Sequence, residues 1–99
     1  MQCRFIDTGF NNAFTNMAID EAILRYCQIP TLRVYGWNPA AISIGYNQDI
    51  ENEINVGYCK KNNIEIVRRI TGGKAVFHDK EITYSFILPE NNNLIPFEV

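Results

Sequence analysis

Residues 68–79 read RRITGGKAVFHD, and this stretch carries more information about the fold than any other part of the chain. It concentrates positive charge, flexible backbone and the only histidine of the chain between two predicted strands. Gly72 and Gly73 allow positive φ angles and a close approach of backbone N–H groups to a ligand. Because neighbouring strand residues point to opposite faces, only one of Arg68 and Arg69 faces a shared cavity, and we expect Arg69, which lies nearer the glycines. The stretch therefore predicts a ligand-binding loop.

Other interpretations of this region are open. On turn chemistry alone, a plain hairpin turn at the glycine pair has the same weight as a ligand loop. A phosphate-binding P-loop is excluded, because Ala75 stands where Ser or Thr is required and Arg68 stands where the first glycine is required. A strand-end histidine such as His78 is more often hydrogen-bonded to backbone than catalytic. Trp37 and Tyr46 either cover a cleft or, more commonly for such aromatics, pack in the core.

The hydrophobic pattern on both sides of the loop predicts a series of strands and helices. Runs rich in β-branched and aromatic residues predict strands at 2–7, 31–35, 41–46, 65–70, 75–78 and 82–88. Apolar residues at helical spacing predict a helix that ends before Pro30, and a second, polar surface helix is predicted at 49–63. Because a short loop joins 31–35 to 41–46, we expect these strands to form a hairpin or to lie side by side. The tail after residue 88 reads as an exposed loop.

The composition limits the size and class of the protein. The chain has 99 residues with 46% hydrophobic side chains, and 9 basic against 11 acidic side chains give a formal net charge of −2. A chain of this length has room for one domain, and so a two-lobed enzyme is excluded. The charge gives no general reason to expect a nucleic acid or an anionic membrane as a partner. No apolar stretch approaches the roughly 18 residues that span a bilayer, so we expect no membrane insertion.

The cysteine pattern disfavours both disulfides and metal binding. The chain has an odd number of cysteines, namely Cys3, Cys27 and Cys59, and no two of them form a C-x-x-C motif. A disulfide framework and a structural zinc site are therefore not expected. His78 is the single histidine and does not complete a His/Cys cluster, so we expect no metal ion. Reduced thiols are typical of a cytoplasmic protein, which is the localisation we predict.

Four segments of the chain resemble one known family in their order. FIDTG (residues 5–9), NMAIDEAIL (16–24) and LRVYGWNPAAISIGYNQ (32–48) precede RRITGGKAVFHDKEITYSF (68–86). Together they resemble the biotin/lipoate protein ligase superfamily, in which an Arg-Arg-x-Thr/Ser-Gly-Gly-x-Ala-Val-x-His-Asp loop is followed by a Thr-Tyr-Ser strand. Within the superfamily the chain is most similar to the octanoyltransferases of Gram-positive lipoate biosynthesis, with the lipoate-protein ligases close behind. The resemblance covers residues 5–88, which is nearly the whole chain.

The resemblance implies a catalytic domain of the class II aminoacyl-tRNA synthetase and biotin ligase type. This is an α/β fold of the α+β kind, in which helices flank a mixed β-sheet. Residues 1–99 are then expected to be the N-terminal portion of a single, incomplete domain, because the family's catalytic cysteine and lysine follow the Thr-Tyr-Ser strand. The chain alone is expected to be inactive and to hold no catalytic residue. The positions that match the family's ligand-contacting loop are Arg69, Thr71, Gly72, Gly73, Lys74, Ala75, Val76, Phe77 and His78.

The chemistry implied by the resemblance is acyl transfer in lipoate metabolism without a cofactor. An octanoyl or lipoyl group passes from acyl carrier protein to an enzyme cysteine, and then to a lysine of a lipoyl domain or of a glycine-cleavage H-type protein. One alternative is an ATP-dependent lipoate-protein ligase, which uses ATP and Mg²⁺, although Lys74 stands where many ligases have a third glycine. Another is a non-catalytic module that binds an acyl group or a partner protein. A second chain that completes the domain is a further expected partner.

Overall fold

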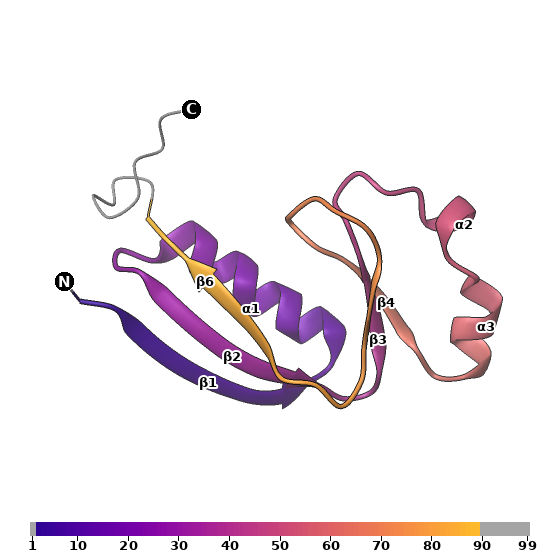
Figure 1. The fold of residues 1–99 in the computed structure, drawn as a ribbon, viewed down its shortest axis with the longest axis horizontal. Helices are drawn as coiled ribbons and strands as arrows, with labels where there is room; N and C mark the ends of the chain where they lie inside the picture. Colours follow the sequence, from indigo (N-terminus) through magenta and orange to yellow (C-terminus); the bar gives the residue numbers. More distant parts are fainter. Residues whose placement is uncertain (1, 90–99) are drawn as a thin grey trace.

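The computed structural model describes residues 2–89, and this range contains six strands and three helices (Figure 1). In chain order they are β1 (Arg4–Asn11), α1 (Ala13–Tyr26), β2 (Thr31–Trp37), β3 (Ala41–Ile44), α2 (Ile50–Glu53), α3 (Val56–Lys61), β4 (Glu65–Arg68), β5 (Val76–His78) and β6 (Thr83–Ile87). Within the described range, no helix is both long enough and apolar enough to cross a membrane. The tail that we expect to be an exposed loop lies outside the described residues from residue 90 onward.

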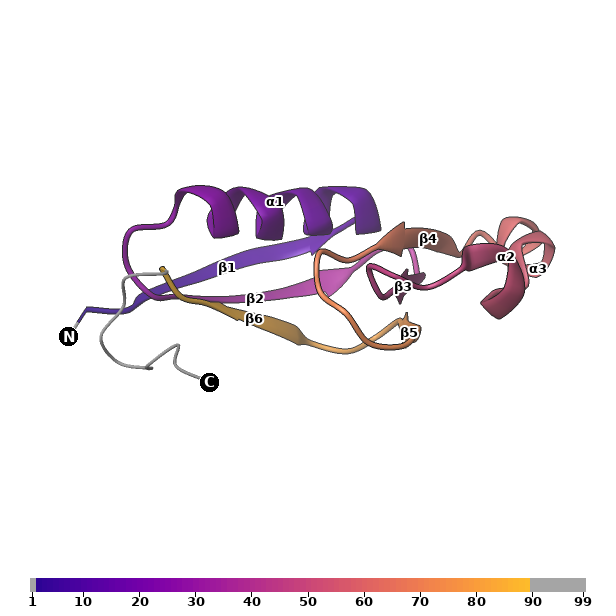
Figure 2. The same cartoon turned by 90° about the horizontal axis from the view of Figure 1, so that it is seen from above.

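The strands form two small mixed sheets. In the first, β2 lies between β1, to which it is parallel, and β6, to which it is antiparallel. In the second, β3 lies between the parallel β4 and the antiparallel β5. Helix α1 runs along one face of the first sheet, and α2 and α3 lie at the far end of the second sheet (Figure 2). The prediction of an α/β fold with mixed strands flanked by helices is confirmed.

The expected pairing of β2 with β3 is wrong, because the two strands belong to different sheets. Both edges of β2 are already occupied, by β1 and β6. The loop between β2 and β3 contains Pro39, which has no N–H to donate, and it carries the chain from one sheet into the other. The interpretation of the Gly72–Gly73 pair as a hairpin turn is also wrong. The strands before and after it, β4 and β5, pair with opposite edges of β3 and not with each other.

Two predicted elements differ from the observed ones in ways that local chemistry explains. Strand β1 continues beyond its predicted end at residue 7 to Asn11, and a bulge between Asp7 and Phe10 accommodates the additional residues. Gly9 adopts φ +71° in this bulge, a value that glycine reaches without strain. The single helix predicted at 49–63 is divided into α2 and α3. Asn55 causes the division, since its side chain accepts from the Tyr58 N–H at 3.0 Å and caps a new helix.

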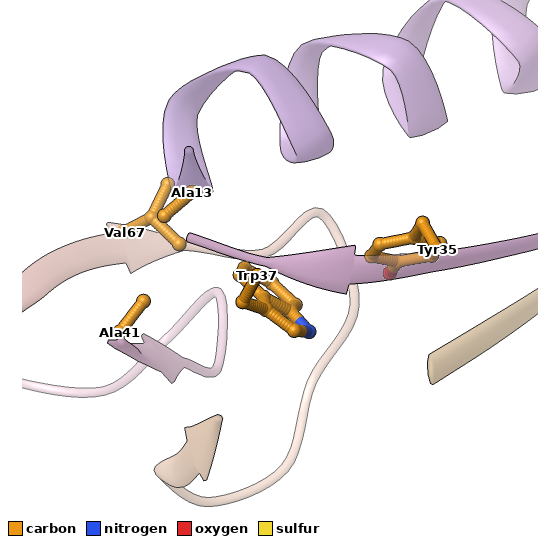
Figure 3. Close-up of a cluster of buried hydrophobic side chains, with 5 residues drawn as sticks. All are labelled: Ala13, Tyr35, Trp37, Ala41 and Val67. Atoms are coloured by element: carbon orange, nitrogen blue, oxygen red, sulfur yellow. The ribbon is translucent and has the colours of Figure 1, made fainter. Parts of the chain in front are cut away.

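An apolar cluster joins the two sheets and the start of α1 (Figure 3). Its buried members are Ala13 of α1, Tyr35 and Trp37 of β2, Ala41 of β3 and Val67 of β4. In Figure 3, Val67 points toward Ala13, so that β4 packs directly beneath the first turn of the helix. The backbone N–H of Ala13 also donates to Glu65 Oε1 at 3.0 Å, which ties the same two elements together. The core therefore lies at the junction of the two sheets.

Helix α1 faces its sheet with polar as well as apolar side chains. Arg33 of β2 is fully buried beneath the helix and donates to Asp20 Oδ1 at 2.7 Å and to the Asn16 side chain at 2.8 Å. Its guanidinium also lies 3.7 Å from the centre of the Tyr35 ring. A buried arginine requires such partners. This requirement explains why the helix presents Asn16 and Asp20 to the sheet. Phe14 of the same helix remains largely exposed.

Candidate functional site

A cavity of about 540 Å³ lies beside the core, at the junction of the two sheets. Side chains from α1, β2 and the segment after β4 form its walls, and β6 runs along it. The lining residues of apolar type are Met17, Leu24, Tyr35, Trp37, Ile70, Tyr84, Phe86, Ile87 and Leu88. The polar ones are Asp20, Ser43, Arg69, Thr71, His78, Thr83 and Ser85. An apolar hollow with a small number of polar groups is typical of a site for a small organic ligand.

Arg69 is the cation of the cavity wall, and the backbone around it fixes its position. Its Nη1 donates to the carbonyl and to the hydroxyl oxygen of Ser43, both at 2.9 Å. Its Nη2 donates to the carbonyl oxygens of Gly72 at 2.8 Å and Lys74 at 3.0 Å. Arg68 points elsewhere and donates to carbonyl oxygens of the loop after β3, among them that of Gln48 at 2.8 Å. As predicted, Arg69 and not Arg68 faces the cavity.

The loop that contains the two glycines is held closely against the end of β3. The N–H of Tyr46 donates to the Thr71 carbonyl, and the N–H of Arg69 donates to the Ile44 carbonyl, both at 2.9 Å. Gly45 and Gly73 approach so closely that a Cβ atom on Gly45 would overlap with the backbone of Gly73. Gly73 itself has φ +99°, a conformation that other residues rarely adopt. Gly45 and Gly73 are therefore needed for the close backbone approach that brings Arg69 to the cavity.

His78 lies at the end of β5, buried between the two sheets. Its ring stacks on the Trp37 indole, with ring centres 4.0 Å apart and planes 11° apart. Its Nε2 lies 2.8 Å from Ser43 Oγ, and its Nδ1 lies 3.1 Å from a carboxylate oxygen of Glu81. Burial lowers the pKa of the His78 imidazole, and the Arg69 cation lowers it further, while the Glu81 carboxylate opposes both. The imidazole is therefore neutral near pH 7.

A second polar group lies on the α1 side of the cavity, around Asp20. Beyond its pairing with Arg33, Asp20 accepts from Ser85 Oγ at 2.8 Å and from the Tyr35 hydroxyl at 3.3 Å. Burial is the main reason why the pKa of the Tyr35 hydroxyl is raised, and the nearby Asp20 carboxylate contributes to the rise. Tyr35 thus stays protonated and contributes a neutral hydroxyl donor to this wall. The arrangement positions Tyr35 and Ser85 beside the apolar side chains.

Comparison with known families identifies the chain. The family described as the lipoyl protein ligase A/B catalytic domain matches residues 12–98. The chain belongs to this family. The signature loop that carries Arg69 and His78 lies within the matched range. The resemblance inferred from the sequence motifs is therefore confirmed.

Known members of the lipoyl protein ligase A/B family resemble the chain in sequence and in fold. Octanoyltransferase LipM of Clostridioides difficile is 50% identical over 95% of this chain. A Thermoplasma acidophilum protein solved with bound lipoic acid is 37% identical and superimposes with a TM-score of 0.78 over 87% of the chain. Lipoate-protein ligase A solved with ATP is 39% identical, with a TM-score of 0.76 over 87%. The chain spans 36%, 37% and 36% of the lengths of these three relatives.

The nine positions matched to the family's ligand loop separate into two groups. Arg69, Thr71 and His78 line the cavity. Gly72, Gly73, Lys74, Ala75, Val76 and Phe77 follow the loop and β5 outside the lining. The side chains of Val76 and Phe77 are about half exposed, at 45% and 54%. Alternation along β5 predicts that His78 and Phe77 face opposite sides, and His78 is the one that is buried. Ligand contact by either group of residues stays a prediction.

Several residues in or near the cavity lie outside the positions that match the family's loop. Trp37 packs in the core, as expected for an aromatic between strands, and it also lines the cavity, whereas Tyr46 is exposed and does not. Ser43 is fully buried and Glu81 is exposed, and both contact His78. Alternation within the strand predicted at 41–46 places Ser43 on one face, but nothing in the sequence indicates that this face meets a histidine from another strand.

None of the three cysteines lines the cavity. Cys3 is exposed, Cys27 follows the last turn of α1, Cys59 is buried in α3, and all three thiols are free. Within residues 2–89, no group of three or more His, Cys, Asp or Glu side chains is arranged to hold a metal ion. The polar side chains that line the cavity offer a guanidinium, an imidazole, a carboxylate and hydroxyl groups, which can bind and orient the polar end of a ligand.

Proposed function

We propose that this chain forms the acyl-binding part of an octanoyltransferase of lipoate metabolism. The proposed reaction moves an octanoyl group from acyl carrier protein to a lysine of a lipoyl domain or of a glycine-cleavage H-type protein. The observation that carries the proposal is the cavity, in which an apolar wall ends at the Arg69 guanidinium and the His78 ring. The 50% identity to an octanoyltransferase supports the choice of acyl group. The free cysteines support a cytoplasmic site of action.

The apolar wall supplies the binding energy in this proposal, and the polar end supplies the orientation. Burial of an eight-carbon chain contributes about 5–6 kcal/mol, at roughly 0.8 kcal/mol per methylene. Met17, Leu24 and Trp37 would contact the methylenes from α1 and β2. The positive charge of the Arg69 guanidinium would favour the negative charge that develops on the acyl carbonyl oxygen during transfer. The nucleophile of the transfer is not assigned to a cysteine of this chain, because none of them lies at the cavity.

The two groups of loop residues have separate roles in the proposal. Arg69, Thr71 and His78 contact the acyl group, because they line the cavity. The segment 72–77, which lies outside the lining, contacts the thioester end of the donor or the acceptor protein. No cofactor is required, since the thioester of the donor is already activated.

An ATP-dependent lipoate-protein ligase is the second candidate. The observation that favours it is the likeness to lipoate-protein ligase A solved with ATP, which is 39% identical to the chain. In a ligase the segment 72–77 would face the nucleotide, and ATP and Mg²⁺ would be required to activate the free acid. Activity assays on the purified protein distinguish the two candidates. Octanoyl transfer from acyl carrier protein without ATP supports the transferase, whereas octanoate-dependent exchange of pyrophosphate into ATP supports the ligase.

Acyl binding can be tested with the intrinsic fluorescence of Trp37, the only tryptophan of the chain. We expect octanoate to change the emission and to bind more than about a hundredfold more tightly than butyrate, because four methylenes contribute about 3 kcal/mol. Ile70→Ala, in the cavity wall, should weaken octanoate binding, and Ile54→Ala, outside the wall, should not. Equal affinity for octanoate and butyrate would show that the cavity does not hold an acyl chain.

A further inference from the structure

A directed chain of hydrogen bonds links both walls of the cavity to one residue outside it, Glu81. On one side, Trp37 Nε1 donates to Thr83 Oγ1 at 2.8 Å, and Thr83 Oγ1 donates to Glu81 Oε2 at 3.4 Å. On the other side, His78 Nδ1 lies 3.1 Å from Glu81 Oε1, and His78 Nε2 lies 2.8 Å from Ser43 Oγ. Trp37, Thr83, His78 and Ser43 line the cavity, but Glu81 does not.

The chemistry of Glu81 sets the positions of the protons in this chain. An ionised carboxylate only accepts hydrogen bonds, so the His78 Nδ1 that contacts it must carry a proton. Because the imidazole is neutral near pH 7, its Nε2 then carries no proton and accepts from the Ser43 hydroxyl. Ser43 Oγ keeps its remaining lone pairs for Arg69, whose guanidinium only donates. Glu81 thus selects one of the two neutral forms of His78.

We infer that Glu81 is a positioning residue for the cavity, acting through His78 and Ser43 on Arg69 and through Thr83 on Trp37. Glu81 follows β5 and precedes β6, so it lies where the chain passes from one sheet to the other. Its two carboxylate oxygens contact one wall each: Thr83 belongs to the first sheet and His78 to the second. Its side chain is 42% exposed, whereas that of His78 is 9% exposed. A partly exposed carboxylate therefore controls the geometry of a buried site.

Removal of the carboxylate changes what His78 can donate. Without the Glu81 carboxylate, the Nδ1–H of His78 loses its hydrogen-bond acceptor. The form of the ring with its proton on Nε2 is then favoured, because Nε2–H donates to Ser43 instead. The Ser43 hydroxyl proton must then find another acceptor in a fully buried place, beside the same guanidinium. A glutamine at position 81 keeps an amide oxygen that accepts from Nδ1. Glu81→Gln should therefore preserve the arrangement that Glu81→Ala destroys.

The chain contains one histidine and one tryptophan, so nuclear magnetic resonance reports on both ends of this network without overlap. Long-range ¹H–¹⁵N spectra at pH 7.5 should show His78 in the Nδ1–H form in the parent chain and in Glu81→Gln. Glu81→Ala should show the Nε2–H form or a mixture and should also shift the Trp37 indole N–H signal. Glu51→Ala, at an exposed glutamate of α2, should leave both signals unchanged. A parent chain with His78 in the Nε2–H form would overturn the inference.

A second measurement addresses the cavity itself and rests on the proposed function. Octanoate should bind Glu81→Ala about tenfold more weakly, as expected for the loss of one charge-assisted hydrogen bond, and Glu81→Gln within about threefold of the parent chain. Dispersed backbone spectra verify that each variant is folded. If octanoate binds no variant and not the parent, the proposed function fails, while the histidine spectra still decide the inference. If the parent binds and Glu81→Ala binds equally well, Glu81 does not position the site.

Discussion

Gly45 shows how a single missing side chain shapes the site. The close approach of its backbone to Gly73 brings the loop against β3, and there Arg69 finds its acceptors on Ser43, Gly72 and Lys74. A methyl group at position 45 has no room, because the nearest atoms are backbone and do not move aside like the end of a flexible side chain. The contact therefore links the identity of one residue to the position of a charged group in the cavity.

We expect Gly45→Ala to destabilise the chain by about 1–3 kcal/mol, the usual cost of overpacking a filled site. It should also weaken octanoate binding, because the loop must shift away from β3 and carry Arg69 with it. Urea unfolding followed by circular dichroism gives the first quantity, and Trp37 fluorescence gives the second. Gly72→Ala is the matched control, since a Cβ there meets no atom within 4 Å and should change neither. Equal losses for both variants would contradict the argument from close approach.

At the scale of the single element, a buried ion pair attaches helix α1 to its sheet. Arg33 is fully buried, and its charge is matched by Asp20 at 2.7 Å. Removal of one partner leaves the other charge buried and unpaired, which costs about 3–5 kcal/mol. We therefore expect Arg33→Leu to lower the free energy of unfolding by about this amount and to loosen α1, as measured by urea unfolding and by amide hydrogen exchange in the helix.

The surface of the same helix offers a control for the ion pair. Arg25 and Glu21 approach to 3.6 Å at i,i+4 spacing, with both side chains largely exposed. An exposed pair of this kind contributes about 0–1 kcal/mol, and so Arg25→Ala should be nearly neutral. If Arg33→Leu proved as mild as Arg25→Ala, the buried guanidinium would not be what attaches the helix.

The sequence predicted where most elements lie but not how they pair. Runs rich in β-branched and aromatic residues located all six strands of the range that the structure describes. Pairing depends on contacts between residues distant along the chain, which short-range patterns do not encode. The short loop around Pro39 therefore suggested a hairpin, although β2 and β3 join different sheets. The contact between Ser43 and His78, 35 positions apart, was missed for the same reason.

At the scale of the whole molecule, residues of both sheets form the cavity: β2 and β6 belong to the first sheet, and β3 and β5 belong to the second. Trp37 belongs to this core and also lines the cavity, so a single side chain both joins the sheets and forms the site. Its ring stacks on His78 of the other sheet. Stability and binding are therefore coupled at this residue, and a ligand that fills the cavity should stabilise the junction by mass action.

The first sheet has two faces of opposite character. Arg33 and its cross-strand neighbours point toward α1, and so the next residues along each strand point away from it. This outer face carries Phe5, Leu32 and Phe86 in one row across the three strands, and Val34 and Tyr84 in the next. The aromatic side chains remain 50–71% exposed, although a contiguous apolar surface is unusual on a folded chain.

Because these aromatic side chains are exposed, we expect the outer face to bind hydrophobic dyes without supporting the fold. The double variant Tyr84→Thr with Phe86→Thr, which keeps residues that favour strands, should lower the fluorescence of bound 8-anilinonaphthalene-1-sulfonate. It should change the free energy of unfolding by only about 1 kcal/mol or less. Tyr58→Ser removes an equally exposed aromatic side chain from α3 and should leave the dye signal unchanged. A loss of stability as large as that expected for Arg33→Leu would show instead that these rings are buried and that the face is covered.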